Sequence, residues 1–512
     1  MRWVHYLGIA VMGMAVYSLR LKAPFTADDH FIFLKLQQGG VFGFASQPPS
    51  MFFRPLISLH YYLDYVLWGV YPLLSHFINL LWHTLCGILV WRLTYRLLIR
   101  WGWTPFQAEP AAYWSAVLFT ILPANVEAVA WFAARADMVA TAGALGALIL
   151  LEQFQKQGKA ILYWGAVLCF AGGLFCKESL LTFPVMAWLW LRYLGIPSAG
   201  RLLLPFWGVW LLYLVLRTWA IQGVGSYPHA WETLTRPWLL VVNGVAYLFQ
   251  MGMPAILYGL GRDHWDTLIW GVWGLGMLLT LYGWRSQRVE KPASSIDWRL
   301  LMGLALLAIV PVIIFKPSPF YFLNSRYTYL ASAFVVVGAG AWLYLMARRG
   351  AWLRAGLALV LVAYYGGALR QVDAWREAGD VARASLMSLR HTPSDTTLLI
   401  LSLPDHFHGA YIWRAGFHEA VALLLPERAP QPMYVMSRFT MRLRTDVAVH
   451  FGEGVATLSS PQDIFLPPEG VRTPPGDEVI VMPDKLIVPL AIQRQGMVLL
   501  YSGGEFVPVY GH

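Results

Sequence analysis

Long apolar segments follow one another through most of this chain, and they constrain its fold more than any other feature. Twelve runs within the 512 residues are apolar enough to span a bilayer, or nearly so: 3–19, 73–98, 111–122, 126–151, 162–175, 179–194, 202–221, 238–257, 268–284, 300–315, 327–347 and 352–369. A spanning helix needs about 20 residues, so the shorter runs are expected to extend into flanking polar residues. Only 13% of the residues are charged and 58% are hydrophobic, whereas soluble domains carry about 25% charge. The sequence therefore predicts a mainly α-helical, polytopic membrane protein.

Clusters of Arg and Lys between these runs predict which loops are cytoplasmic. The clusters are Arg92, Arg96 and Arg100; Lys156 and Lys159; Arg192 and Arg201; Arg285, Arg288, Lys291 and Arg299; and Arg348, Arg349 and Arg354. Simple alternation through all twelve runs would put the last two clusters outside. One run between 202 and 284 is therefore expected not to cross the bilayer.

The run 238–257 is the best candidate for the segment that does not cross. It contains Asn243, Gln250 and Pro254, and such residues suit a re-entrant or interfacial element that is covered by protein. About eleven spans then place the N-terminus in the cytoplasm and the C-terminal part outside. In the alternative, 111–122 and 126–151 form one broken span. It is less favoured because the basic residues flanking these runs predict cytoplasmic loops on both sides.

Net charge and cysteine positions further limit the class of membrane protein that the sequence predicts. The formal net charge of +10 fits basic cytoplasmic loops and does not indicate nucleic-acid binding. Cys86, Cys169 and Cys176 lie in or beside apolar runs, so no disulfide framework is predicted. The first run lacks an A-x-A cleavage site and is expected to remain as a span. Short cytoplasmic loops favour a bacterial inner membrane, with a eukaryotic endoplasmic reticulum as the alternative.

The composition changes near residue 370, which divides the predicted membrane domain (1–370, first outer loop 20–72) from a soluble domain (371–512). The stretch Asp373–Arg390 has helical character. Short β-rich runs then alternate with Pro and Gly turns at 397–401, 433–436, 478–482, 485–488 and 497–501. We expect this tail to be a small α+β or mostly β domain on the extracytoplasmic side.

Ionisable residues lie near the predicted outer ends of several spans, where charge close to the hydrocarbon is costly and therefore often functional. The residues assigned to a candidate site are Asp28, Asp29, Arg54, His83, Glu127, Arg135, Asp137, Lys177, Glu178, Arg326 and Tyr327. The adjacent acids Asp28 and Asp29 follow the first apolar run within ten residues of its end. They are the strongest single indication of a site.

Spacing predicts how some of these residues are arranged. His76, Asn79 and His83 are three and four residues apart, so they are expected to share one face of the second span, pointing toward protein or a cavity. Glu127 and Asp137 are ten residues apart, which is about 15 Å along a continuous helix.

Carboxylates and cations at one membrane face suit the transfer of a sugar from a lipid-linked sugar phosphate. Arg and Lys can hold the phosphate as its charge develops, and a carboxylate can take the proton from an attacking hydroxyl. The apolar tail of the donor would lie in the bilayer. In the alternative, neighbouring charges such as Arg135 with Asp137, or Lys177 with Glu178, simply pair to satisfy buried helices.

Several segments resemble the GT-C superfamily of integral-membrane glycosyltransferases, and within it the protein O-mannosyltransferase-like group. They are FTADDHFIF (25–33), FRPLISLHYYLDYVLWG (53–69), HFINLLWH (76–83), ILPANVEAVAWFAARADMVA (121–140), CKESLLTFP (176–184) and NSRYTYL (324–330). They cover much of 25–184, with one later anchor. No tetratricopeptide repeats follow the last span and no β-trefoil repeat is evident, so the tail differs from better-known relatives.

The resemblance implies a GT-C fold, a polyprenyl-phosphate sugar donor and inversion at the anomeric carbon, with mannose as the sugar. Asp28 stands as the base and Asp29 as its orienting partner, slightly favoured over the reverse. Arg135, Lys177 and Arg326 would hold the donor phosphate. Supporting positions go to Arg54, His83, Glu127, Asp137, Glu178 and Tyr327. The acceptor hydroxyl would belong to a protein, a glycan or a lipid.

The sequence also bears on metal binding and on two alternative functions. His406, His408, His418 and Glu419 fit no standard metal-ligand spacing, so no metal is assigned to them. A divalent cation at the acidic pair stays open because some GT-C enzymes require one. A transporter or flippase of lipid-linked sugar would predict inverted repeats. A non-catalytic membrane assembly subunit would not need the acidic pair.

Overall fold

The computed structural model describes residues 2–45, 52–197, 199–223, 228–285, 296–318, 320–441, 447–452, 455–460, 464–467, 480–489, 496–503 and 505–509. The chain divides into two compact units. The larger, here called the helical unit, comprises Met1–Ser18, Val41–Leu67 and Leu74–Val372. The smaller, here called the mixed unit, comprises Leu19–Gly40, Trp68–Leu73 and Asp373–His512. Arg288 and Lys291 of a predicted cytoplasmic loop lie outside the described residues.

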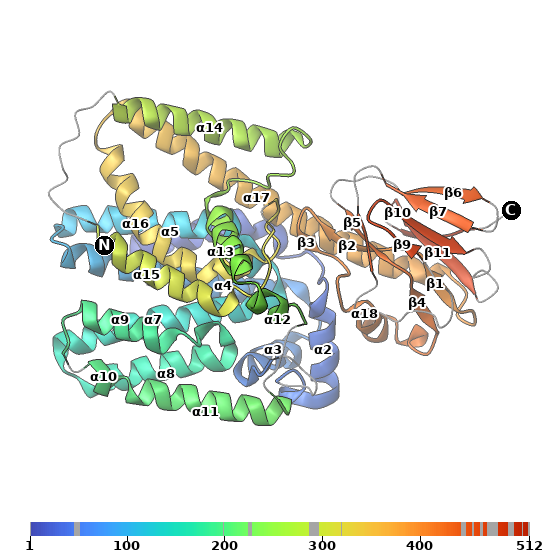
Figure 1. The fold of residues 1–512 in the computed structure, drawn as a ribbon, viewed down its shortest axis with the longest axis horizontal. Coiled ribbons are helices and arrows are strands. Elements are labelled where there is room, and N and C mark those ends of the chain that lie inside the picture. The colour runs from blue at the N-terminus through green and yellow to red at the C-terminus, as the bar shows by residue number, and fades with distance from the viewer. Residues whose placement is uncertain are drawn as a thin grey trace. The chain divides into compact units, whose positions relative to one another are not determined.

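The helical unit is built from helices joined by turns, short helical elements and some longer connections (Figure 1). Its longer helices are α1 (Arg2–Tyr17), α3 (Pro55–Trp68), α4 (Pro72–Arg100), α5 (Pro105–Ile121), α7 (Arg135–Gln157), α8 (Ala160–Cys176), α9 (Phe183–Tyr193), α11 (Leu204–Ile221), α13 (Pro237–Gly252), α14 (His264–Arg285), α15 (Trp298–Ile309), α16 (Tyr329–Ala347) and most of α17 (Ala351–Ser388). Short elements between them are α6 (Val126–Ala130), α10 (Ala199–Leu202), α12 (Pro228–Thr235), η3 (Pro123–Asn125), η4 (Phe132–Ala134), η5 (Glu178–Leu180), η6 (Val310–Val312) and η7 (Ser325–Thr328). Several helices begin at proline, whose fixed φ suits the first helical position and whose missing N–H would have no intrahelical partner there.

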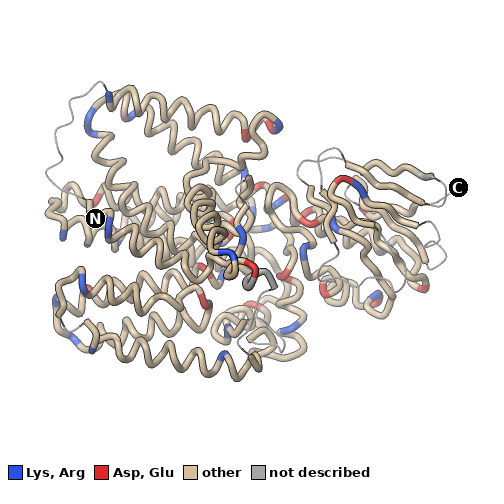
Figure 2. The backbone as a smooth tube through the Cα atoms, viewed as in Figure 1, with Lys and Arg blue, Asp and Glu red and all other residues tan. Residues whose placement is uncertain are grey.

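Six helices among the described residues are long and apolar enough to cross a membrane: Pro72–Arg100, Phe132–Gln157, Ala199–Ile221, His264–Arg285, Ser325–Ala347 and Ala351–His391. The bent pair Pro105–Ile121 and Pro123–Ala130, with a 55° angle, makes a seventh if it is one broken span. Ala160–Cys176 and Trp298–Val312 are shorter apolar helices. Figure 2 shows long helical stretches of this unit that carry no Lys, Arg, Asp or Glu. The chain is thus a multi-pass membrane protein, while eleven crossings and their orientation stay predictions.

Close helix contacts in this unit depend on glycine. A Cβ built at Gly143 of α7 would lie 2.6 Å from the carbonyl oxygen of Cys169 in α8 and 3.1 Å from the Cα of Gly173. The same holds for α14 and α17, where a Cβ at Gly276 would lie 2.8 Å from the carbonyl oxygen of Gly356. Small residues let helix backbones approach closely, so these pairs fix the packing of their helices.

The mixed unit contains a C-terminal domain with both strands and helices, as the sequence predicts. Its helices are α2 (Asp28–Gly39), the last part of α17, and α18 (Phe417–Leu424). Its strands are β1 (Leu398–Ile400), β2 (Leu403–Phe407), β3 (Ala410–Tyr411), β4 (Met433–Val435), β5 (Arg438–Met441), β6 (Ala448–Gly452), β7 (Val455–Ser459), β8 (Phe465–Leu466), β9 (Ile480–Val481), β10 (Lys485–Pro489), β11 (Met497–Ser502) and β12 (Glu505–Pro508).

The described strands form three four-stranded sheets, in the orders β12-β11-β1-β4, β6-β7-β10-β9 and β3-β2-β5-β8. β1 is parallel to both β11 and β4, and β2 is parallel to β5, whereas the β6-β7-β10-β9 sheet is antiparallel throughout. The segment 19–40, predicted to be part of the membrane domain's first outer loop, groups with this domain because α2 packs against α18.

Candidate active site

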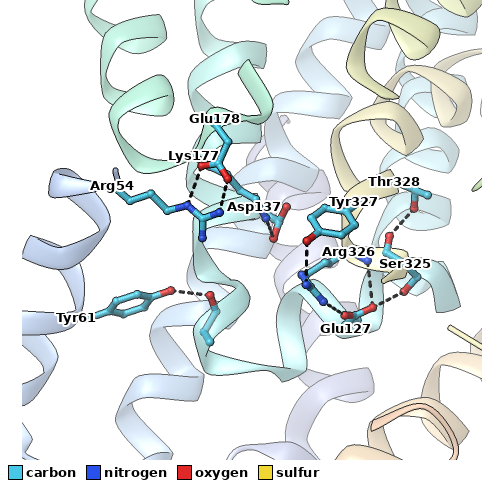
Figure 3. A network of polar contacts seen from close by, with 11 residues as sticks. Arg54, Tyr61, Glu127, Asp137, Lys177, Glu178, Ser325, Arg326, Tyr327 and Thr328 are labelled. Carbon is cyan, nitrogen blue, oxygen red and sulfur yellow. Dashed lines mark hydrogen bonds and ion pairs between the residues drawn. The ribbon is translucent and has the colours of Figure 1, made fainter. Parts of the chain in front are cut away.

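Three ion pairs in the helical unit join cations and carboxylates that are far apart in the sequence (Figure 3). Arg54 donates through Nε and Nη2 to the two Glu178 oxygens, at 2.8 and 2.5 Å. The Nζ of Lys177 lies 2.5 Å from Oδ2 of Asp137. Arg326 pairs with Glu127 through Nη1.

The partners are separated by 124, 40 and 199 residues, respectively. The alternative prediction, in which Arg135 pairs with Asp137 and Lys177 with Glu178, is therefore wrong. Lys177 pairs with Asp137, Glu178 with Arg54, and Arg135 with Asp64. Packing of distant segments, rather than sequence proximity, decides which charge meets which.

Tyr327 links two of the cations. The Lys177 Nζ lies 5.0 Å from the centre of its ring, and the Arg326 guanidinium carbon lies 4.5 Å from the same centre. Arg326 also donates through Nη2 to the Tyr327 hydroxyl at 3.1 Å, and Phe315 stacks on the Tyr327 ring with centroids 4.7 Å apart. Aromatic faces attract cations, and the attraction is stronger where water is excluded. Lys177 and Arg326 thus face one aromatic ring.

Burial and neighbouring charges shift the pKa values of the two residues in the turn between α8 and α9. Burial lowers the pKa of Lys177 to about 8, although the nearby Asp137 carboxylate opposes this. Burial tends to raise the pKa of Glu178, but the Arg54 guanidinium and Lys177 outweigh it and lower the pKa to about 2. Glu178 is therefore an anion at any working pH, whereas Lys177 can lose its proton in mildly alkaline solution.

The continuous helix predicted across Glu127 and Asp137 is wrong. Trp131, with φ −91° and ψ 122°, is extended and separates α6 from η4 and α7. The amide nitrogen of Asn79 in α4 donates to the carbonyls of Val129 and Trp131 at 3.1 and 3.2 Å. Non-helical backbone is tolerated in a membrane protein where other protein groups form hydrogen bonds with its free N–H and C=O groups. Asn79 does this for the two carbonyls at the break. The break lets Glu127 and Asp137 serve different cations.

Arg135 has partners of its own. Its Nε donates to Oδ1 of Asn79 at 2.7 Å, and its Nη2 donates to Oδ2 of Asp64 at 2.6 Å and to the Ser75 carbonyl at 2.9 Å. Arg135 is fully buried and lies against the Phe132 ring, 5.0 Å from its centre. These bonds tie α3 and α4 to the start of α7. Its role as a phosphate ligand stays a prediction.

His83 lies within the helix packing. Its Nδ1 is 2.6 Å from the Tyr329 hydroxyl, and its Nε2 is 3.3 Å from the Thr120 carbonyl. His76, Asn79 and His83 are all buried, which confirms the predicted inward face of α4. A supporting role of His83 in chemistry stays a prediction.

The acidic pair lies in the mixed unit, at the start of α2. Asp29 is fully buried, its Oδ2 accepts a hydrogen bond from the Thr26 N–H at 3.0 Å, and its own N–H donates to the Thr26 carbonyl at 3.1 Å. The Arg20 guanidinium lies close enough to interact with the Asp29 carboxylate. Asp28 is partly exposed. Asp28 is thus the more accessible carboxyl of the pair, and its role as a base stays a prediction.

The residue before the pair is strained. Ala27 has φ 46° and ψ −127°, a backbone conformation that residues with a Cβ rarely adopt. Such a conformation costs about 1–3 kcal/mol and persists only where the surroundings enforce it. Strained residues cluster at functional sites, so the turn that presents Asp28 is itself a candidate functional feature.

Metal binding finds no further support among the described residues, where no group of three or more His, Cys, Asp or Glu side chains could hold an ion. In the tail, the Nε2 of His418 lies 3.2 Å from the Met433 carbonyl, and His406 and His408 are buried. A cation at the acidic pair is an open alternative that the family resemblance raises, and no metal is assigned there.

The sequence did not identify several residues that organise the site. Asp64 holds Arg135, Trp131 lies 4.8 Å from the Arg326 guanidinium, and Phe315 covers Tyr327. Asp64 within an apolar helix was a usable signal, because a buried acid needs a partner. Trp131 and Phe315 are indistinguishable from packing residues without the fold.

Comparisons with known proteins complete the description. No family model and no curated protein matches the chain. A structure of ArnT from Cupriavidus metallidurans bound to undecaprenyl phosphate has a TM-score of 0.40 and 11% identity, covering 85% of this chain and 86% of that chain. ArnT from the same organism in the apo state gives a TM-score of 0.33 and 14% identity, with 85% of each chain covered. Such low TM-scores carry no conclusion about fold or activity here.

Proposed function

We propose that the chain is a GT-C-type glycosyltransferase, which moves a sugar from a polyprenyl-phosphate donor to an acceptor hydroxyl on the extracytoplasmic face of a membrane. The observation that carries the proposal is the cluster of Arg54, Lys177 and Arg326 with their carboxylate partners, at a break between apolar helices. All three cations belong to segments that resemble GT-C motifs. The same resemblance suggests mannose as the sugar.

The cations are suited to a phosphate leaving group. A guanidinium has five N–H donors, so Arg54 and Arg326 can each bind a carboxylate through one edge and a phosphate through another. Asp137 and Glu178 keep the cations oriented before the substrate arrives, which lowers the reorganisation needed in the reaction. The Tyr327 ring attracts both Lys177 and Arg326, which offsets part of their mutual repulsion.

In the proposed reaction, the acceptor oxygen attacks the anomeric carbon from the face opposite the phosphate. The bond between the anomeric carbon and the phosphate oxygen breaks, and the polyprenyl phosphate leaves with both bonding electrons. The family resemblance, rather than any observed geometry, assigns removal of the proton of the acceptor hydroxyl to Asp28. The sugar then has inverted configuration, and the extra negative charge on the leaving phosphate is stabilised by Lys177 and Arg326.

The test is turnover by the purified full-length protein in lipid nanodiscs, with a radiolabelled polyprenyl-phosphate mannose and a panel of peptide, glycan and lipid acceptors. We expect release of polyprenyl phosphate by the wild type, and its loss in Asp28→Asn. Asp395→Asn, which changes an exposed acid in the same unit, serves as the matched control and should retain activity. Equal donor consumption by wild type and Asp28→Asn would reject the assigned base.

Cation variants test the phosphate site separately. Lys177→Gln should raise the donor KM by about 10-fold to 100-fold, which corresponds to the 1.5–3 kcal/mol typical of a hydrogen bond to a charged group. Lys156→Gln is the control, because Lys156 also pairs with a carboxylate, Glu152, but its side chain is 50% exposed. Movement of intact donor across the bilayer without any transfer would instead favour a transporter.

A further inference from the structure

We infer that the C-terminal segment Leu403–Leu424 holds the strained turn that presents Asp28 and Asp29, with Gly416 as a positioning residue. This inference rests on the proposed function, because it gives the C-terminal domain a part in the same reaction. The segment and the turn both belong to the mixed unit. His406, His408, His418 and Glu419 lie in this segment, but neither their spacing nor the family resemblance gives it a role.

The contact between the two segments is made by backbone atoms. The N–H of Ala27 donates to the Ile412 carbonyl at 2.9 Å. The Ala27 carbonyl oxygen lies directly over Gly416, and a Cβ built there would collide with it and lie 2.9 Å from the carbonyl carbon. Both polar groups of Ala27 are thus confined by the C-terminal segment. Glycine is required at 416 for this approach as well as for its φ of +79°.

Side chains reinforce the same contact. The rings of His30 and Trp413 lie 5.6 Å apart, and the Trp413 Nε1 donates to Oγ of Ser385 at 2.8 Å. α18, which begins directly after Gly416, packs against α2. The C-terminal segment therefore contacts the acidic turn in three ways: through the backbone of Ala27, through the His30 ring and through the packing of α18 on α2.

The C-terminal segment is itself fixed in its own domain. Asp405 forms a buried ion pair with Arg438 of β5 at 2.6 Å, and its carbonyl accepts the Ile412 N–H at 2.8 Å. The Trp413 N–H donates to the Pro404 carbonyl at 3.1 Å. A rigid support of this kind can maintain an unfavourable conformation at Ala27, whereas a mobile loop would let it relax. The C-terminal domain thereby sets the direction in which Asp28 points.

The test compares Gly416→Ala with Gly503→Ala in the full-length protein. Both glycines have positive φ and lie in the same domain, but a Cβ at Gly503 would meet nothing within 4 Å. The two variants carry a similar backbone cost, and only the first disturbs Ala27. We expect Gly416→Ala to lower kcat by about 10-fold to 100-fold relative to Gly503→Ala, as displaced catalytic groups do, with an unchanged donor KM.

Two further measurements separate positioning from a loss of folding. Hydrogen exchange of the peptide covering 24–36 should be faster in Gly416→Ala than in Gly503→Ala. Adding Ala27→Gly to Gly416→Ala should restore part of the lost kcat, because glycine adopts positive φ without support. General damage to the C-terminal domain would not be rescued by a change at residue 27. If Gly416→Ala does not fold, Ser385→Ala, which removes the acceptor of Trp413, should show the same effects more weakly.

The outcomes distinguish this inference from the function on which it rests. A wild type that never consumes the donor refutes the proposed function, and hydrogen exchange still tests the contact. An active wild type with equal kcat and equal exchange in the two glycine variants overturns the positioning role. Lower kcat in Gly416→Ala with rescue by Ala27→Gly supports it.

Discussion

Among the three proposed phosphate-binding cations, Lys177 is the one whose charge state should change with pH in the working range. Its pKa is lowered to about 8 by burial, and only the protonated form can hold a phosphate. The donor KM should therefore be constant below pH 8 and rise about tenfold per pH unit above it. Lys177→Arg keeps its charge over this range and should remove the rise. KM measured between pH 6.5 and about 9.5 tests this, and identical profiles for both proteins would contradict it.

Arg135 makes structural contacts whose contribution can be measured separately from its predicted role as a phosphate ligand. Asp64→Asn leaves a fully buried guanidinium without its anion, so we expect the free energy of unfolding to fall by about 3–5 kcal/mol. The control is Glu232→Gln, which breaks the exposed pair with Arg236 and should cost less than about 1 kcal/mol. Denaturation in detergent measures both.

The double variant Arg135→Met with Asp64→Leu should recover much of the loss, because apolar residues of similar size often replace a buried ion pair without a stability penalty. If Asp64→Asn is no more harmful than Glu232→Gln, the pair does not anchor these helices.

At the scale of elements, hydropathy predicts where helices lie but not where they break. Each apolar run contains one or more helical elements, and the predicted β-rich runs overlap β1, β4, β9, β10 and β11. Residues 478 and 479 of one run lie outside the described part of the chain. The break at Trp131 was missed because it depends on Asn79, about fifty residues away, which satisfies the freed carbonyls. Sequence periodicity contains no information about that contact.

Two adjacent glycines in α8 offer a test of helix packing. A Cβ at Gly173 would lie 2.6 Å from a methyl carbon of Leu180 and 3.2 Å from the Ala140 carbonyl oxygen, whereas at Gly172 it would meet nothing within 4 Å. Alanine favours a helix over glycine by about 1 kcal/mol at either position. Gly173→Ala should nonetheless destabilise the protein by about 1–3 kcal/mol through overpacking, while Gly172→Ala should be neutral or stabilising.

Thermal unfolding of the two alanine variants side by side measures the difference. A common response of both would show that α7 and α8 can move apart without cost.

At the scale of the whole molecule, composition predicts the division into an apolar helical part and a β-containing tail, but it does not predict which segments belong together. Asp28 and Asp29 belong to the segment predicted as the first outer loop, yet this segment packs with the C-terminal domain. The reason is physical: Ala27 and Gly416 meet through backbone atoms, which leave no pattern of side chains for sequence analysis to find. The same holds for the cation pairs, whose members come from segments up to 199 residues apart.

The polar side chains of α13 have a clear structural role that bears on the number of crossings. Asn243 donates to the Ile313 carbonyl at 2.8 Å, and Gln250 donates to the carbonyls of Ser318, Tyr321 and Leu323 at 2.8, 3.0 and 3.1 Å. These bonds satisfy backbone groups in the irregular segment that precedes η7. Backbone groups outside helices need protein partners in a membrane protein, and the polar side chains of α13 supply them. The presence of these polar residues is therefore accounted for even if α13 does not cross the bilayer.

Topology mapping decides whether α13 crosses. Seven apolar runs lie between Lys159 and Arg348, namely 162–175, 179–194, 202–221, 238–257, 268–284, 300–315 and 327–347. If both residues are cytoplasmic, an even number of these runs crosses, and 238–257 is the one that does not. The run 352–369 then carries the chain outward, and Asp395 lies outside.

The experiment uses a variant that lacks Cys86, Cys169 and Cys176. An impermeant maleimide should label Asp395→Cys in intact cells, and Lys159→Cys and Arg348→Cys only in opened membranes. Labelling of Arg348→Cys but not Lys159→Cys in intact cells would mean that an odd number of these runs crosses, as when all seven do, and would place the C-terminal domain in the cytoplasm. The proposed extracytoplasmic reaction would then be untenable, because the acidic pair belongs to the same compact unit as that domain.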